Sequence, residues 1–280
     1  MDSAPDAAYE SALPKTFAGS RMTTEPRLAL AASETPAAQA AREAMANDHD
    51  WAPLAEADAV VVLGGDGFML TVLHQMLDLD HVVPAYGINY GTVGFMMNKV
   101  RSTRSIEQRV ARATPISVTP LQMVARTHAG ETISAYAINE VSLLRETRQT
   151  ARLEITVNDK VRMADLACDG ILVATPAGST AYNLSANGPI LPLGSQMLAL
   201  TPISPFRPRR WKGAILPQSA EVSFRVLEPA KRPVAAVADQ KEVRDIDSVT
   251  ITAARDRQLH LLFDRGASLE ERIFAEQFLV

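Results

Sequence analysis

The sequence predicts an N-terminal α/β domain with a Rossmann-like parallel sheet, followed by an all-β, sandwich-like C-terminal domain. From residue 27 to about 116, short apolar runs alternate with stretches of helical periodicity, which is the pattern of βαβ units. From about 117 to 261, apolar residues recur at every second position between turns that contain Pro or Gly, which favours antiparallel strands. A chain of 280 residues is long enough for two such domains.

Strands and helices should alternate in the first domain. We expect, in order, a strand over 28–32, a helix from Pro36 to about Met45 capped by Ser33 or Thr35, a strand over 59–63, a helix over 68–77, a strand over 82–88 and a helix over 105–113. The run 59–63 is apolar throughout, as in a parallel strand that is covered on both faces. Because parallel α/β domains bind ligands at the carboxyl ends of their strands, the residues after 63 are the first place to look for a site.

In the second domain, apolar and polar residues alternate over 153–157, 222–226 and 249–251, as in half-buried strands. A final amphipathic helix carries Leu269, Ile273, Phe274 and Phe278. We therefore expect 262–280 to pack back on the first domain or on a partner subunit. Residues 1–21 are interpreted as a disordered extension, with Met22 as an alternative start. The predicted domains are 22–116 and 117–261, with the active site between them.

Composition excludes several classes of function. The formal net charge of -4 gives no general electrostatic basis for binding nucleic acid. No apolar run approaches the ~20 residues of a membrane span, and the N-terminus lacks the apolar core of a signal peptide. Cys168 is the only cysteine, so an intrachain disulfide is impossible, which is consistent with a cytoplasmic protein.

A glycine-rich loop, Gly64-Gly65-Asp66-Gly67, follows the apolar run 59–63 directly. Glycine allows close approach of the backbone to a ligand, and exposed N–H groups in such a loop can bind phosphate. A carboxylate there would repel phosphate unless it removes a proton or holds a metal, which suggests phosphoryl transfer to a hydroxyl with Asp66 as base. The alternative is a tight turn in which Asp66 caps the helix. The P-loop and dinucleotide-binding patterns are both absent.

A second motif runs from Asp169-Gly170 through an apolar strand to the segment 175–183, Thr-Pro-Ala-Gly-Ser-Thr-Ala-Tyr-Asn. Small residues admit a flat ligand, hydroxyls bind sugar or phosphate, and Tyr182 can stack on a base. The alternative is a capped helix start with Tyr182 in the core. A hydrolase nucleophile is not indicated, because G-x-S-x-G and a nearby His are missing.

A third motif, Asn139-Glu140, follows a predicted strand over 134–138. An amide beside a carboxylate can hold two ribose hydroxyls or an adenine edge. Taken alone, the pair also fits a strand terminus with a turn-forming Asn.

The order of these three motifs resembles the NAD kinase family, and the resemblance extends over roughly 27–280. The segment 175–182 is the most diagnostic part, because the glycine loop alone also resembles diacylglycerol and sphingosine kinases. A lipid kinase would need an apolar cleft and membrane attachment, which the polar run 175–183 does not favour. A non-catalytic nucleotide sensor on the same fold is a further alternative, but a sensor has no use for the carboxylate of Asp66.

The resemblance implies a phosphotransferase with an alcohol group as acceptor, which converts NAD to NADP with ATP or polyphosphate as donor. Asp66 would be the general base on the 2'-hydroxyl of the adenosine ribose, and Gly64, Gly65 and Gly67 would shape the phosphate loop. Asn139 and Glu140 would bind the ribose and base, Asp169 the nicotinamide end, and 180–185 the adenine pocket. The implied NAD-binding set is Asp66, Gly67, Asn139, Glu140, Asp169, Ala177, Thr180, Ala181, Tyr182, Asn183, Leu184 and Ser185.

The resemblance also implies Mg²⁺ that arrives with the phosphoryl donor, no metal held by protein side chains, and a homodimer or homotetramer. Three positions depart from the family pattern. Ala177 stands where Thr or Ser is usual, Phe68 where many members have Asn, and Asp239-Gln240 replaces an Asp-Gly-Gln, which leaves Gln240 as a candidate contact only. A basic patch over 207–212 could meet donor phosphates or a neighbouring subunit, or be a solvated loop.

Overall fold

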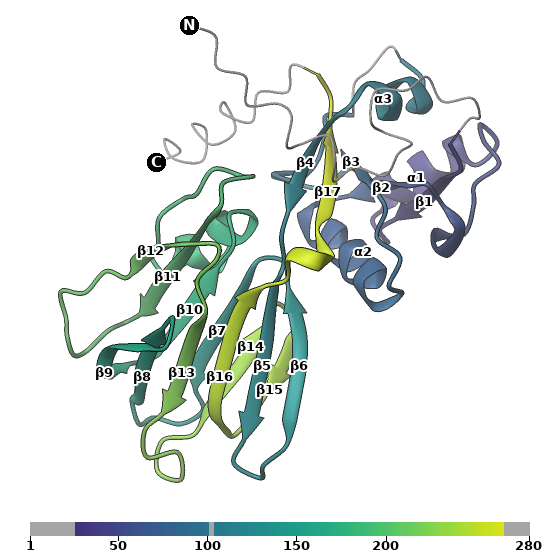
Figure 1. The fold of residues 1–280 in the computed structure, drawn as a ribbon. Coiled ribbons are helices and arrows are strands. Elements are labelled where there is room, and N and C mark those ends of the chain that lie inside the picture. Colours follow the sequence, from purple (N-terminus) through teal and green to yellow (C-terminus); the bar gives the residue numbers. More distant parts are fainter. Residues whose placement is uncertain (1–25, 101–103, 266–280) are drawn as a thin grey trace, which may run out of the picture. The chain divides into compact units, whose positions relative to one another are not determined.

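The computed structural model describes residues 26–100 and 104–265 (Figure 1). The chain divides into two compact units, one up to Pro115 together with the segment from Leu262, and one over 116–261. The divisions predicted from the sequence were after 116 and after 261. The predicted N-terminal extension, the alternative start at Met22 and the final amphipathic helix lie outside the described residues.

The first unit is built on a sheet that has five strands in the described part of the chain, in the order β1-β2-β3-β17-β4. Their bounds are β1 (Leu28–Ala32), β2 (Ala59–Gly64), β3 (Ala85–Asn89), β4 (Thr114–Val118) and β17 (Leu259–Phe263). β1, β2 and β3 pair in parallel, which confirms the predicted α/β class. β4 and β17, which were not predicted from the sequence, complete this sheet. The chain passes from the first unit to the second within β4 and returns within β17.

The helices of the first unit are α1 (Pro36–Met45), α2 (Asp66–Asp78) and α3 (Ile106–Arg112), with a short 3₁₀ turn η1 (Leu54–Glu56). Pro36 occupies the first turn of α1, where its missing N–H costs nothing. Ser105 caps α3 by accepting a hydrogen bond from the Gln108 amide at 3.5 Å. The predicted apolar face of α2 is buried, but α2 begins two residues earlier than expected, so Asp66 lies in its first turn.

A polar cluster fixes the end of β17 to this unit. The buried guanidinium of Arg109 donates to the Asp264 carboxylate at 2.8 Å, and the Tyr86 hydroxyl donates to the same carboxylate at 2.6 Å. The Asn98 amide donates to Gly87 O and Leu262 O, while its oxygen accepts from the Asp264 N–H. These bonds satisfy groups that would be costly to bury alone.

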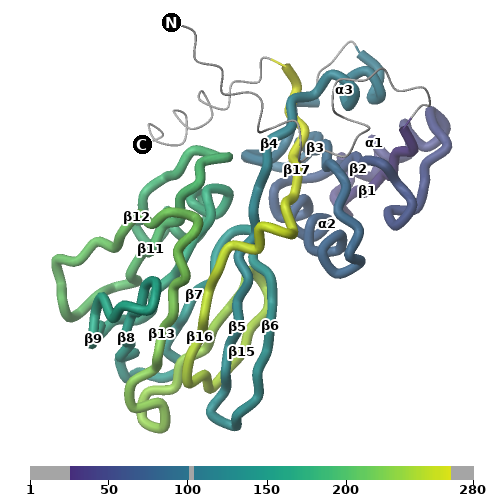
Figure 2. The backbone as a smooth tube through the Cα atoms, viewed as in Figure 1, coloured from purple at the N-terminus to yellow at the C-terminus, as the bar shows by residue number. Residues whose placement is uncertain are grey.

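The second unit contains two antiparallel sheets, each with six strands in the described part of the chain (Figures 1 and 2). The first sheet, in spatial order, consists of β12 (Ala214–Pro217), β11 (Met197–Ile203), β10 (Gly170–Ala174), β7 (Glu140–Arg145), β14 (Val234–Ala238) and β15 (Lys241–Val243). The second consists of β6 (Thr132–Ala137), β5 (Leu121–Thr127), β16 (Ile246–Ala253), β13 (Val222–Val226), β8 (Ala151–Val157) and β9 (Lys160–Cys168). The predicted sandwich-like class is confirmed.

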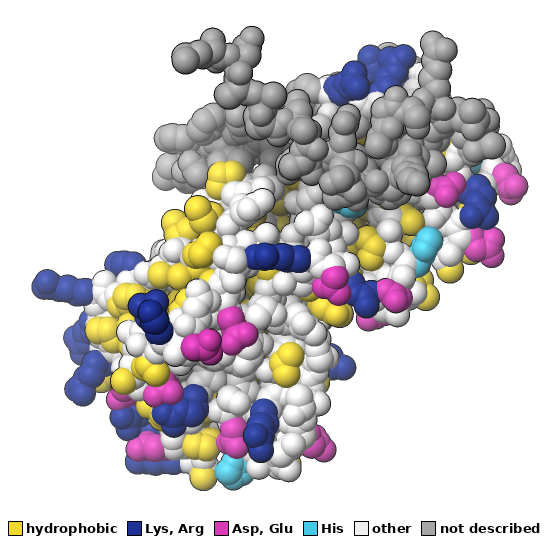
Figure 3. Space-filling model, viewed as in Figure 1, with side chains coloured by type: hydrophobic (Ala, Val, Ile, Leu, Met, Phe, Trp, Pro, Cys, Tyr) yellow, Lys and Arg dark blue, Asp and Glu magenta, His cyan; other side chains and the backbone are white. Residues whose placement is uncertain are grey.

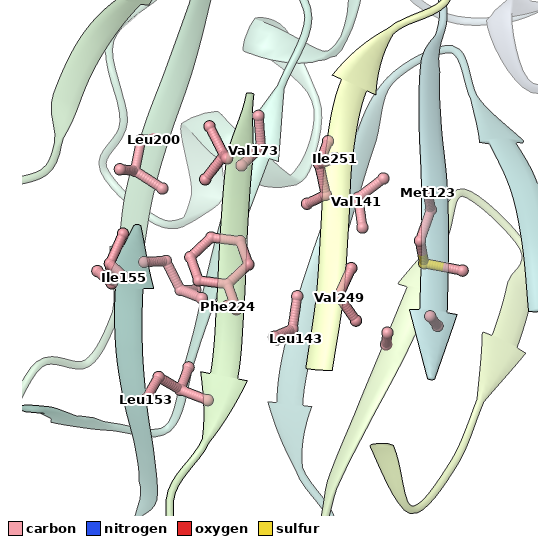
Figure 4. Close-up of a cluster of buried hydrophobic side chains, with 14 of the residues drawn as sticks. Met123, Val141, Leu143, Leu153, Ile155, Val173, Leu200, Phe224, Val249 and Ile251 are labelled. Atoms are coloured by element: carbon pink, nitrogen blue, oxygen red, sulfur yellow. The ribbon is translucent and has the colours of Figure 1, made fainter. Parts of the chain in front are cut away.

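One apolar core joins the two sheets of the second unit. Figure 4 shows Phe224 of β13 beside Ile155 and Leu153 of β8, with Val141 and Val173 contributed by the other sheet. Alternation explains this core, because every second residue of β8 and β13 points inward.

Outside this core, acidic and basic side chains are interspersed on the face of the second unit shown in Figure 3. Several form ion pairs, such as Arg152 with Asp165 and Arg225 with Glu154. No helix within residues 26–100 and 104–265 is long and apolar enough to cross a membrane.

Candidate functional site

The glycine motif of the first unit is a junction between a strand and a helix. Gly64 is the last residue of β2, Gly65 is the N-cap of α2, and Asp66 and Gly67 lie in the first turn of α2. Two backbone segments meet here, because a Cβ on Gly91 would lie 3.0 Å from Gly65 Cα. The Tyr90 N–H also donates to Gly64 O at 2.7 Å. Glycine at 91 therefore permits a close approach of two chain segments, whereas a Cβ on Gly65 would lie at an ordinary contact distance of 3.5 Å from Gly91 Cα.

The carboxylate of Asp66 accepts hydrogen bonds from three consecutive backbone amides. Oδ2 accepts from the N–H groups of Gly94 and Phe95 at 3.0 and 2.9 Å, and Oδ1 accepts from Met96 at 2.7 Å. The helix-cap interpretation of Asp66 is wrong, because Gly65 is the N-cap and no side chain caps this helix. A carboxylate offers about four lone-pair sites, so about one remains on half-buried Asp66 for a further partner.

Asn89 shapes the loop that supplies these amides. Its side-chain oxygen accepts from the Gly91 N–H at 2.9 Å, and its amide donates to Val93 O at 3.1 Å. Gly94 has φ of +76°, and a Cβ there would lie 2.3 Å from Asn89 Nδ2. Gly94 is thus required both by its left-handed conformation and by its contact with Asn89. This loop was not predicted as part of the site, although Asn89-Tyr90-Gly91 follows a strand as turn residues do.

In the second unit, Asn139 and Glu140 lie where β6 ends and β7 begins. Glu140 opens β7 and faces Ala174, the last residue of β10. The carboxylate of Asp239 accepts from the amides of Ile138, Asn139 and Glu140 at 2.6, 3.0 and 3.2 Å. Asp239 is a site residue to which the sequence analysis gave no role.

The surroundings of the Glu140 carboxyl group disfavour its charged form. Its Oε2 atom is buried and has no hydrogen-bond partner among the described residues. Burial, together with the nearby charge of Asp239, raises the pKa of Glu140 to about 7, and a hydrogen bond from the Tyr182 N–H opposes that rise. Glu140 can therefore change its protonation state near neutral pH.

Much of the polar segment after β10 holds the backbone in place. The Thr175 hydroxyl donates to Ile138 O at 2.6 Å and accepts from the Gly178 N–H at 3.1 Å. The Ser179 hydroxyl donates to Pro176 O at 2.7 Å and accepts from the Leu191 N–H at 3.0 Å. Both residues are fully buried. The expectation that this run of hydroxyls binds sugar or phosphate is wrong for these two, because both hydroxyls are used inside the protein.

Asn183 has the same internal role. Its amide donates to Pro189 O at 2.8 Å and to Ser179 O at 3.2 Å, while its oxygen accepts from the Thr201 hydroxyl at 2.7 Å. The side chain is fully buried, so its polar atoms face the protein interior. Asn183 connects the turn to β11, the next strand of the sheet.

The other residues of this segment become more accessible from Thr180 onwards. The 3₁₀ turn η2 (Ala177–Thr180) leads into the short helix α4 (Tyr182–Ser185). Ala177 is buried, and Thr180 and Ala181 are half-buried, whereas Leu184 and Ser185 are exposed. A Cβ on Gly178 would lie 2.1 Å from Asn139 O, so this turn lies directly against the Asn139 backbone.

Tyr182 is half-buried on the apolar cluster of Leu172, Ala174, Leu191 and Ala199. Burial, with the nearby carboxylates of Glu140 and Asp169, raises the pKa of its hydroxyl. Tyr182 therefore lies near both predicted acidic site residues of this unit.

Asp169 precedes β10, at the far end of the β7–β10 ladder from Glu140. Its carboxylate accepts from Arg145 Nε at 2.6 Å, so the predicted nicotinamide contact is itself paired with a cation. Gln240, the candidate contact, is exposed in the turn between β14 and β15. The second unit thus places Asn139 and Glu140 at one end of the β7–β10 ladder and Asp169 at the other, with Tyr182 of α4 near both carboxylates. Asp66 and its glycines belong to the first unit.

Comparison with known families gives two matches. The model described as ATP-NAD kinase N-terminal domain matches residues 18–114, and the one described as ATP-NAD kinase C-terminal domain matches residues 138–259.

Similar proteins named NAD kinase occur in several bacteria. The protein of Zymomonas mobilis is 56% identical over 252 residues, covering 90% of this chain and 97% of the relative. That of Caulobacter vibrioides is 54% identical over 252 residues, covering 90% and 96%. That of Xanthomonas campestris is 52% identical over 260 residues, covering 92% and 100%.

Two solved structures share the fold. Yeast NADH kinase complexed with NADH has a TM-score of 0.76 at 20% identity, covering 92% of this chain and 88% of that one. The NAD kinase of Archaeoglobus fulgidus in complex with ATP has a TM-score of 0.69 at 23% identity, covering 89% and 98%.

Proposed function

The chain belongs to the NAD kinase family of phosphotransferases, and from that premise we propose that it phosphorylates the 2'-hydroxyl of the adenosine ribose of NAD. The donor is ATP or polyphosphate, and the product is NADP. As the 2'-oxygen forms its bond to the terminal phosphorus, the bond from that phosphorus to the leaving phosphate oxygen breaks, and the hydroxyl proton passes to a carboxylate.

The geometry of Asp66 carries this proposal. Three backbone amides hold its carboxylate in one orientation, and about one lone-pair site on it stays open for the hydroxyl. Proton removal by a positioned base contributes on the order of 10²–10⁴ in rate, provided that the base is within hydrogen-bond reach. Most of the remaining acceleration in phosphoryl transfer comes from positioning and neutralisation of charge. Gly64, Gly65 and Gly67 shape the backbone beside the donor phosphates in this proposal.

The acceptor is bound by the second unit in this proposal. Asn139 and Glu140 bind the ribose and base of NAD, Tyr182 stacks on the adenine, and Asp169 reaches the nicotinamide end. The buried, unpartnered Oε2 of Glu140 supports this assignment, because a bound hydroxyl would supply the hydrogen bond that it lacks. Asn183 contributes by shaping the pocket wall, since its polar atoms are used internally.

We also infer that the donor brings Mg²⁺. No group of three or more His, Cys, Asp or Glu side chains within 26–100 and 104–265 could hold a metal ion. Mg²⁺ commonly binds through substrate phosphates with only one or two carboxylates, which fits this sparse set of donors. When bound, the ion would neutralise developing phosphate charge. By the same family resemblance, we expect a cytoplasmic homodimer or homotetramer.

The proposal is tested by an assay of NADP formation with NAD, Mg²⁺ and either ATP or polyphosphate. A folded sample that binds NAD but forms no NADP with either donor would overturn the function. Asp66→Asn keeps the shape of the side chain but removes its capacity as a base, so we expect turnover to fall by about 10²–10⁴ while NAD affinity stays near wild type.

A matched control is Asp78→Asn, which makes the same charge change at the exposed end of α2. We expect it to retain full turnover. Asp66→Asn gives up at least one amide hydrogen bond, so its folding is checked by unfolding in urea. Wild-type turnover in folded Asp66→Asn would refute the role of Asp66 as base.

A further inference from the structure

Asp239 repeats in the second unit the arrangement found around Asp66 in the first. Its Oδ2 accepts from the Ile138 amide at 2.6 Å, and its Oδ1 accepts from Asn139 and Glu140 at 3.0 and 3.2 Å. Successive backbone N–H groups of this kind form a concave anion site. Here the anion is a side chain of the protein, about one hundred residues away in sequence.

The backbone of residues 138–140 is held from its other side as well. Ile138 O accepts from the Thr175 hydroxyl at 2.6 Å, and Asn139 O accepts from the Thr175 amide at 2.9 Å. The Asp239 N–H donates to Glu140 O at 3.2 Å. Asp239 itself has φ of +50° in the turn after β14 and so adopts a strained conformation that Asp tolerates better than most residues.

We propose that Asp239 is a positioning residue of the NAD site, whose carboxylate fixes the 138–140 backbone and thereby the directions of the Asn139 and Glu140 side chains. This inference rests on the proposed function, in which Asn139 and Glu140 bind NAD. Asp239 acts through these two residues and does not itself touch the substrate. A carboxylate suits the task because charge-assisted hydrogen bonds to backbone amides are stronger than neutral ones.

The charge of Asp239 also acts on Glu140. Both groups are acidic, so the ionised form of Asp239 disfavours ionisation of Glu140, in addition to the effect of burial. Among the described residues, Tyr182 of α4 also faces Glu140 and donates its N–H to the Glu140 carboxyl group. Removal of the Asp239 charge should therefore make Glu140 ionise at lower pH. This shift reports the loss of the Asp239 charge, and the KM for NAD, compared with kcat and with the KM for ATP, separates positioning from a general loss of structure.

The experiment compares wild type, Asp239→Asn and Asp245→Asn. Asn keeps the size of the side chain, but its NH₂ group would face one of the three amide donors. We expect the KM for NAD to rise roughly tenfold or more, the scale of a lost charge-assisted hydrogen bond, with a smaller change in kcat and in the KM for ATP. The midpoint of the pH dependence of the KM for NAD should also shift to lower pH.

Asp245 is a close control, because it is exposed and has φ of +51°, similar to the φ of Asp239. It follows β15, whereas Asp239 precedes this strand. Asp245→Asn should leave both KM values and the pH profile at wild type. The inference is overturned if Asp239→Asn keeps the wild-type KM for NAD, or if both KM values rise together with no shift of the pH midpoint.

Asp239→Glu replaces Asp239→Asn if the latter does not fold. It keeps the charge but moves the carboxylate, so a raised KM for NAD with an unshifted midpoint is expected, and an unchanged KM overturns the inference. NAD binding is also measured by calorimetry on the same proteins. If the wild type binds NAD but forms no NADP, the proposed function fails, and the calorimetric comparison still decides the role of Asp239.

Discussion

Glu140 should make the stability of this protein depend on pH in a way that one substitution removes. Its pKa is raised from the ordinary value of 4.5 to about 7, chiefly by burial. A carboxyl group with a raised pKa in the folded state stabilises that state when protonated. Its contribution is complete below about pH 4.5 and is lost as the pH rises through about 7.

The magnitude follows from the size of the shift. A difference of about 2.5 pKa units, at about 1.36 kcal/mol per unit, corresponds to about 3 kcal/mol. Gln at position 140 does not titrate and can still accept from the Tyr182 N–H. Its buried NH₂ group adds a cost that does not vary with pH. We therefore expect Glu140→Gln to gain about 3 kcal/mol relative to wild type between about pH 4.5 and about pH 8.

The measurement is urea unfolding of both proteins across this pH range, with the midpoint and slope fitted at each pH. Trp211 packs against the core of the second unit and provides a fluorescence signal from the same unit as Glu140. Glu131→Gln, a change at an exposed Glu of this unit, should give a curve parallel to wild type. If the curves of wild type and Glu140→Gln are parallel over the whole range, burial and Asp239 do not act on Glu140 as argued.

Two further predictions concern Gly94 and Cys168. Gly94→Ala places a Cβ 2.3 Å from Asn89 Nδ2 at φ of +76°, so it should cost about 2–4 kcal/mol of stability and lower turnover by displacing the amides that hold Asp66. Gly130→Ala is the control, because Gly130 has φ of +87° but its added Cβ would have no neighbouring atom within 4 Å. It should cost only about 1 kcal/mol of stability and leave turnover unchanged. Equal effects of the two variants on unfolding and on NADP formation would contradict the role of Gly94. Cys168 is fully buried, and burial raises the pKa of its thiol to about 12. The thiol should therefore resist a thiol reagent at neutral pH until the protein is unfolded. Full labelling of the folded protein within minutes would contradict this prediction.

Periodicity was sufficient to predict three of the five strands of the first unit's sheet, β1, β2 and β3, and the helices α1, α2 and α3. The strand 28–32 is predicted with both ends correct, and 59–63 lacks only Gly64, because apolar runs between turn residues mark buried parallel strands well. The alternation at 153–157 and 222–226 likewise predicted strands of the sandwich. By contrast, β17 is a run of five buried residues whose sequence does not say which sheet it joins. That choice depends on tertiary packing across the whole chain.

The candidate site was only partly predictable for a related reason. The residue types at Asp66 and Asn139-Glu140 suggested chemistry, but the groups that hold them are backbone amides. Every residue except proline carries an N–H, so an amide that binds a carboxylate leaves no signature in the sequence. The partners of Asp66 lie 28 to 30 residues away, and those of Asp239 lie 99 to 101 residues away. The residue types of this loop gave an indirect signal, because Asn and Gly after a strand indicate a turn, and Gly94 indeed has a positive φ.

The segment 175–183 shows why a structural and a functional interpretation of one motif need not compete. Thr175, Ser179 and Asn183 use their polar atoms to hold the backbone, as a structural interpretation requires. The same bonds fix the turn against Asn139 and leave Tyr182 half-exposed beside Glu140. A hydroxyl that contacts NAD could be replaced with a local loss of affinity. Loss of an internal hydroxyl should instead release the whole turn, so substitutions at Thr175 or Ser179 should impair folding and NAD binding together.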